Sequence, residues 1–143
     1  MAMTLQPNSP DLSARLRSFF QEQPRVELAW LFGSAARGTT GPLSDVDVAV
    51  RFSGPGDDDF NDRLRLHDAL CRYLGSDRVD LIDLAQASPV LRFNVICDGI
   101  LLKGDHSVRV PFEVRAMSEY FDTHALREPH DAALRASAGA GRT

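Results

Sequence analysis

Apolar residues along the chain recur with two spacings, one typical of helices and one typical of strands. After Ser9-Pro10, which has the form of a helix cap followed by proline, Leu12, Leu16 and Phe19 fall on one helical face. Four other stretches are short and dense in β-branched and aromatic residues, as strands are. We therefore predict strands at 26–32, 45–52, 78–84 and 100–103. We predict helices from Pro10, from 57 to about 74, from 89 to just before Gly99, and from about 108 to 121 or beyond.

Glycine, proline and charged residues mark where these elements begin and end. Gly41-Pro42 predicts a loop ahead of the second strand, and the acidic run 57–59 suits the N-terminus of a helix. The inward face of the helix that follows is predicted to carry Phe60, Leu64, Ala69 or Leu70, and Tyr73. We expect residues 136–143, which are small and polar, to form a disordered tail. No repeat or linker divides the sequence, so we predict a single domain over residues 1–143.

Composition and charge narrow the classes of function. The 143 residues carry a formal charge of −4 and a pI near 5.5, which argues against direct binding to nucleic acid through clustered Lys and Arg. No apolar run approaches the ~20 residues that span a bilayer, so we expect no membrane association. Cys71 and Cys97 lie far apart in apolar stretches, which predicts two buried free thiols. We therefore expect a cytoplasmic protein.

The chemistry of the sequence concentrates in Gly33-Ser34 and, after ten intervening residues, Asp45-Val46-Asp47. Residues two apart in a strand point to the same side, so Asp45 and Asp47 present two carboxylates at one edge of the sheet. Mg²⁺ takes oxygen ligands and is commonly shared between one or two carboxylates and substrate phosphates. Gly33 lets the backbone approach a phosphate, to which the N–H and hydroxyl of Ser34 can donate. The pattern predicts a site for a metal–nucleotide complex.

Each half of this pattern has an ordinary structural explanation when taken alone. An Asp-x-Asp pair is often a solvated strand end, and a Gly-Ser pair is often a tight turn. Their combination at this spacing favours the functional interpretation. Arg37 lies in the turn after Ser34 and could bind phosphate oxygens through its forked guanidinium, or could equally be a solvated or structurally paired arginine.

The spacing of Gly33-Ser34 and Asp45-Val46-Asp47 resembles the signature of the nucleotidyltransferase superfamily that includes DNA polymerase beta and kanamycin nucleotidyltransferase. The longer strings Leu31 to Gly38 and Ser44 to Val50 look like the minimal nucleotidyltransferases of prokaryotes. Within those, the chain is most similar to the MntA-type antitoxins that are paired with HepT toxins. Segments 79–84, 91–93, 99–102 and 112–122 also resemble that subgroup, so the resemblance covers roughly Leu28 to Asp122.

The resemblance implies an α/β (α+β) fold, a small mixed β-sheet with helices packed on one side. It implies ATP as the co-substrate and transfer of AMP to a tyrosine of the toxin, which silences a HepT-like partner in a hetero-oligomer. Asp45 and Asp47 would hold Mg²⁺, in two ions by the two-metal logic, while Gly33 and Ser34 would position the triphosphate. A third catalytic and metal-binding carboxylate would lie on the neighbouring strand.

Two aspartates on that strand, Asp80 and Asp83, are candidates for the third carboxylate. Because they are three residues apart in a strand, their side chains point to opposite faces. Asp83 has capping-box-like spacing to Gln86, which offers it a structural use. Asp80 lies between Val79 and Leu81, where a carboxylate without a partner would be costly, and it falls where the family's third acid occurs. We therefore assign the catalytic role to Asp80.

Two other functions remain open at this stage. The same chemistry could act on a small hydroxylated acceptor such as an aminoglycoside, although the chain has little beyond the core fold from which to build a drug pocket. Alternatively, a non-catalytic antitoxin could neutralise its toxin by binding alone, against which the intact set of Gly33, Ser34, Asp45, Asp47 and Asp80 speaks.

Overall fold

A four-stranded mixed sheet forms the centre of the protein. The computed structural model describes residues 10–33, 45–54 and 59–137, with side chains described for 12–33, 45–54 and 61–123. The strands are β1 (Val26–Phe32), β2 (Val46–Phe52), β3 (Val79–Asp83) and β4 (Ile100–Lys103), in the order β3-β2-β1-β4. β1 runs antiparallel to β2 and β4, whereas β2 and β3 are parallel. The predicted strands and the mixed sheet are confirmed.

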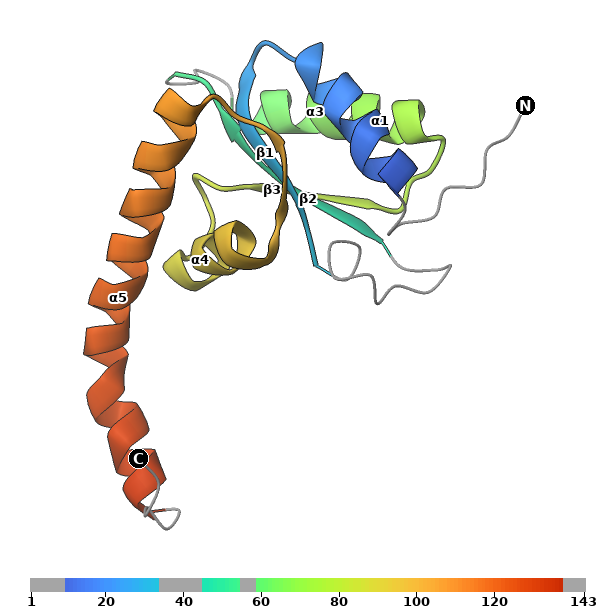
Figure 1. The fold of residues 1–143 in the computed structure, drawn as a ribbon. Coiled ribbons are helices and arrows are strands. Elements are labelled where there is room, and N and C mark those ends of the chain that lie inside the picture. The colour runs from blue at the N-terminus through green and yellow to red at the C-terminus, as the bar shows by residue number, and fades with distance from the viewer. Residues whose placement is uncertain (1–9, 34–44, 55–58, 138–143) are drawn as a thin grey trace.

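Helices cover both faces of this sheet (Figure 1). Helices α1 (Pro10–Gln21) and α3 (Asp59–Leu74) pack on one face, and α4 (Pro89–Asp98) and the start of α5 (His106–Ser137) pack on the other. The expectation that helices pack on one side is therefore wrong for α4 and α5. The reason lies in β1, which is apolar at nearly every position: Ala29 and Leu31 join the core under α1 and α3, while Leu28 and Trp30 join the core with Val95 and Phe112.

The prediction for the inward face of α3 is confirmed at Leu70 and wrong at Leu64 and Tyr73. Leu66, Leu70 and Leu74 are buried at a regular spacing of four residues, whereas Leu64 and Tyr73 are 48% and 37% exposed. The side chain of Phe60 lies outside the described residues. Tyr73 lies at the rim of the core, where its hydroxyl donates to the carbonyl of Arg15 at 2.9 Å.

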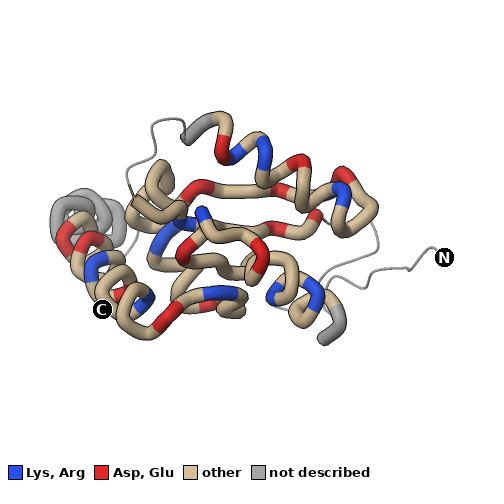
Figure 2. The backbone as a smooth tube through the Cα atoms, turned by 90° about the horizontal axis from the view of Figure 1, so that it is seen from above, with Lys and Arg blue, Asp and Glu red and all other residues tan. Residues whose placement is uncertain are grey.

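Helix α4 begins where the sequence predicts, and α5 begins at His106, two residues before the predicted start. The Ser88 hydroxyl accepts a hydrogen bond from the N–H of Leu91 at 3.1 Å, the expected cap, with Pro89 at the first helical position. Helix α5 continues to Ser137, so the first two residues of the predicted tail are helical and 138–143 lie outside the described residues. In Figure 1, α5 extends away from the sheet, and Figure 2 looks nearly along the axis of this helix.

The two cysteines agree only in part with the prediction. Cys71 and Cys97 are free thiols as predicted, but Cys71 is only partly buried and Cys97 is exposed. Burial and the nearby carboxylates of Asp77 and Asp68 raise the pKa of the Cys71 thiol.

In the described part of the chain, no helix is long and apolar enough to cross a membrane.

Candidate active site

Three strand ends meet where the predicted acidic residues lie. β1 is antiparallel to β2, so its last residue, Phe32, pairs with Asp47 near the start of β2. β3 is parallel to β2, so its start lies beside the start of β2, and Asp47 pairs with Asp80. Residues paired across adjacent strands point to the same face of the sheet. The topology therefore brings Asp47 and Asp80, 33 positions apart in the sequence, to one edge and one face of the sheet.

Gly33 lies directly against the carboxylate of Asp47. Its backbone has a φ of +74°, a left-handed conformation that side chains rarely adopt. A Cβ built on Gly33 would collide with Oδ2 of Asp47. Both the backbone turn after β1 and the position of the Asp47 carboxylate thus require glycine at this residue. The structure places the predicted Gly33 and Asp47 in contact.

Asp45 lies two residues before Asp47 and is exposed. Its Oδ1 forms an ion pair of 3.7 Å with Nη1 of Arg78, and both side chains are more than half exposed. The N–H of Val46 donates to the carbonyl of Arg78 at 2.9 Å, which holds the two chain segments side by side. An exposed pair at this distance stabilises the fold by less than ~1 kcal/mol. Sequence reasoning did not single out Arg78, whose position just before β3 was its only signal.

The set of acids fits a magnesium site of the shared kind. Among the described residues, no three His, Cys, Asp or Glu side chains lie close enough together to form a metal-binding group by themselves. Mg²⁺, however, usually binds one or two protein carboxylates and completes its shell with waters and substrate phosphates. The half-buried Asp47 and the exposed Asp80, in register on parallel strands, supply carboxylates of that kind at an open strand edge.

Asp83 has the structural use that its position in the sequence suggested. It is 6% exposed, and its Oδ1 accepts a hydrogen bond from the N–H of Ala85 at 3.0 Å. The carbonyl of Asp83 also accepts from the N–H of Gln86 at 3.0 Å. The side chain therefore caps the turn after β3 rather than the start of a helix. Asp80 is exposed and Asp83 is buried, so the two lie on opposite faces as predicted.

Two predicted site residues lie outside the described part of the chain. Ser34 and Arg37 belong to segment 34–44, which joins Gly33 to Asp45. Both ends of this segment are described, and both lie at the edge of the sheet where Asp47 and Asp80 pair. The roles of Ser34 and Arg37 in phosphate binding remain predictions.

Comparison with known proteins identifies the family to which the chain belongs. The family model "Polymerase beta, Nucleotidyltransferase" matches residues 14–107. The protein adenylyltransferase MntA of Shewanella oneidensis is 37% identical over 105 residues, which are 73% of either chain.

Solved structures agree with this placement. The chain resembles a crystal structure of a toxin–antitoxin with AMP-PNP, with a TM-score of 0.71 and 32% identity over 85% of this chain and 97% of that one. It also resembles a structure of a tri-AMPylated Shewanella oneidensis HEPN toxin in complex with the MNT antitoxin. The TM-score is 0.65 and the identity 28%, over 85% of this chain and 98% of that one. The chain belongs to the polymerase beta nucleotidyltransferase family, in the group of the MntA adenylyltransferases.

Proposed function

We propose that this protein transfers AMP from ATP to a tyrosine of a HepT-type toxin and thereby acts as its antitoxin. One observation carries the proposal: Asp47 and Asp80 pair across β2 and β3 beside Gly33. An acidic strand edge next to a glycine turn is what a nucleotidyltransferase needs, because the nucleotide phosphates must approach both the carboxylates and the backbone.

The similar proteins indicate which molecule donates AMP and which molecule accepts it. The MntA relative is named a protein adenylyltransferase, and the two similar structures contain an ATP analogue in one case and a tri-AMPylated toxin in the other. We extend both to this chain. The partner would be a HepT-like toxin held in a hetero-oligomer, and the modified toxin would be the inactive form.

The reaction forms one bond and breaks one bond at the α-phosphorus of ATP. The tyrosine oxygen attacks this phosphorus, the bond to the bridging oxygen of the β-phosphate breaks, and pyrophosphate leaves. Asp80, exposed at the edge of the sheet, takes the proton of the attacking hydroxyl. Gly33, Ser34 and Arg37 hold the triphosphate in line, so that positioning does much of the catalysis.

Asp45, Asp47 and Asp80 would hold Mg²⁺, in two ions. When bound, the metal supplies positive charge that activates the attacking oxygen and stabilises the departing pyrophosphate. Arg78 pairs with Asp45 at 3.7 Å, a distance and an exposure that let the carboxylate exchange this partner for a metal. We place the reaction in the cytoplasm, where ATP is available and where the free thiols of Cys71 and Cys97 stay reduced.

A transfer assay tests the proposal. The protein is incubated with Mg²⁺, a candidate HepT-type toxin and each labelled nucleoside triphosphate in turn, and the intact mass of the toxin is measured. We expect AMP addition from ATP, mapped to a tyrosine by peptide sequencing, and loss of addition with EDTA. A toxin that is neutralised without any change in mass would refute the proposal in favour of neutralisation by binding. Transfer to an aminoglycoside but not to the toxin would refute it in favour of a small acceptor.

A further inference from the structure

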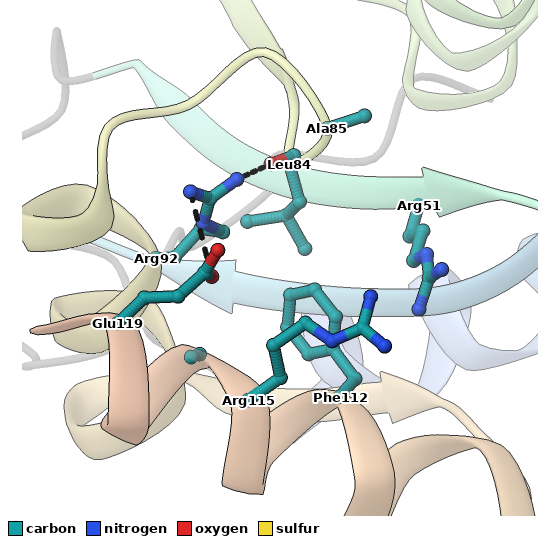
Figure 3. Close-up of a pocket in the computed structure, with 8 residues that line it drawn as sticks. Arg51, Leu84, Ala85, Arg92, Phe112, Arg115 and Glu119 are labelled. Carbon is teal, nitrogen blue, oxygen red and sulfur yellow. Dashed lines mark hydrogen bonds and ion pairs between the residues drawn. The ribbon is translucent and has the colours of Figure 1, made fainter.

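A small cavity with an unusual charge lies near the end of β2, away from the acidic edge at the start of that strand. It occupies about 180 Å³ between β2, the turn after β3, α4 and α5. Arg51, Arg92 and Arg115 line it, together with Leu84, Phe112 and one carboxylate, that of Glu119 (Figure 3). Three guanidinium groups from three separate elements thus line one small cavity, in a protein whose net charge is −4.

Two of these side chains, Arg92 and Arg115, keep guanidinium donors that no bond to another described residue uses. Arg92 donates to the carbonyl of Leu84 at 3.2 Å and pairs with Glu119 at 3.6 Å, but its buried Nε has no hydrogen-bond partner. A buried donor without a partner typically costs ~1–3 kcal/mol. Arg115 has neither an ion pair nor a hydrogen bond to another described residue. Both side chains therefore retain donors for a ligand.

Two of the guanidinium groups also converge. In Figure 3, the side chains of Arg51 and Arg115 point toward one another over the ring of Phe112. The guanidinium carbon of Arg51 lies 5.4 Å from that ring's centroid, and its Nε pairs with Glu27 at 3.3 Å. Both arginines also line an adjoining cavity of about 290 Å³. Glu27 offsets the charge of Arg51 and Glu119 that of Arg92, so three guanidinium groups against two paired carboxylates leave an excess positive charge that favours an anion.

We propose that this cavity binds a phosphate-type oxyanion through Arg51, Arg92 and Arg115. Guanidinium groups bind phosphate oxygens in bidentate pairs, and several of them together favour a multiply charged anion over a single carboxylate. The cavity volume far exceeds the ~30 Å³ share of one water but is small for a drug-sized ligand, which suits a compact ion. Phe112 is buried and contacts Arg51 and Trp30, which leaves little of its ring for a nucleobase to stack on.

The anion site lies on the same face of the sheet as the acidic edge. Asp47, Ala49 and Arg51 alternate along β2 onto this face, and four residues of strand span about 13 Å. Two sources of phosphate are therefore possible: free inorganic phosphate or pyrophosphate, and the phosphodiester of AMP already attached to the acceptor. The second source rests on the function proposed above and on the tri-AMPylated toxin of the similar structure.

Binding is measured first, without a toxin and with EDTA present so that no metal contributes. Phosphate and pyrophosphate are titrated by calorimetry into the whole protein and into Arg115→Gln. Arg72→Gln is the matched control, because Arg72 is an exposed arginine on α3 that pairs with Asp68. We expect phosphate or pyrophosphate to bind the wild type. Arg115→Gln should weaken this binding about tenfold or more, whereas Arg72→Gln should leave it unchanged. No binding, or equal affinity in the wild type and Arg115→Gln, would overturn the proposal.

The source of the phosphate is then decided by the number of AMP units on the toxin. If the ligand is a free ion, Arg115→Gln loses anion binding while the distribution of mono-, di- and tri-AMPylated toxin stays that of the wild type. If the ligand is the phosphodiester of attached AMP, Arg115→Gln makes the first addition at the normal rate and accumulates mono-AMPylated toxin. A wild type that modifies no toxin refutes the proposed function but leaves the calorimetric test of the anion site standing.

Discussion

Asp80 and Asp83 lie three residues apart on one strand, and we predict that mutation separates their roles. Asp80→Asn removes a carboxylate from the edge where β2 and β3 pair, while the exposed position leaves the core untouched. The loss of a general base lowers a rate by ~10²–10⁴-fold. The free energy of unfolding should change by less than ~0.5 kcal/mol, as for most surface substitutions.

Asp83 is expected to behave in the opposite way. Its Oδ1 accepts the N–H of Ala85 at 3.0 Å in a buried position, and asparagine keeps that oxygen. Asp83→Asn should therefore remain active and lose less than ~1 kcal/mol of stability. Asp83→Ala leaves the N–H of Ala85 without its acceptor, which costs ~1–3 kcal/mol. For a chain of this size, that loss lowers the melting temperature by about 3–10 °C.

Two measurements on the three variants test this reasoning. The initial rate of AMP transfer to the toxin reports the catalytic role, and the melting temperature without ligand reports the structural one. A dead Asp83→Asn beside an active Asp80→Asn would show that the active face of β3 is the reverse of the one assigned. An Asp83→Ala variant as stable as the wild type would remove the structural role given to the Ala85 hydrogen bond.

Three further predictions concern the rest of the site. Asp45→Asn or Asp47→Asn should abolish transfer with the fold intact by circular dichroism, because an amide neutralises metal charge poorly; near-normal transfer would contradict the metal assignment. Ser34→Ala should reduce transfer only about tenfold, since backbone donors to the phosphate remain; a loss as complete as that of Asp45→Asn would give Ser34 a larger role. Gly33→Ala should lower transfer at least about tenfold by displacing the Asp47 carboxylate, whereas Gly75→Ala is the control. Gly75 has a similar φ of +69° but open space around its Cβ, so it should lose about 1 kcal/mol of stability and no activity; equal rates for the two variants would contradict the contact.

The sequence by itself determined the elements and the chemistry of the site. Alternation and helical spacing depend on neighbouring residues, so the strands at 26–32 and 100–103 and the capped helix after Ser88 could be predicted from local pattern alone. The family could be predicted from Gly33-Ser34 and Asp45-Val46-Asp47. Close approach of a phosphate and binding of a metal require particular residue types at a fixed spacing, and the sequence shows both. The opposite faces of Asp80 and Asp83 followed from the two-residue period of a strand.

Only the tertiary structure decided which distant segments meet. The parallel pairing of β2 with β3 brings Asp80 to Asp47, and the two apolar faces of β1 place α4 and α5 opposite α1 and α3. Leu66, Leu70 and Leu74 form the inner face of α3 because of where that helix docks, and the apolar spacing of the helix alone predicted only Leu70 among them, as an alternative to Ala69. The cavity between Arg51, Arg92 and Arg115 has no local signal at all. Such contacts are long-range, and a sequence pattern records only the period of an element, not the partner on which it packs.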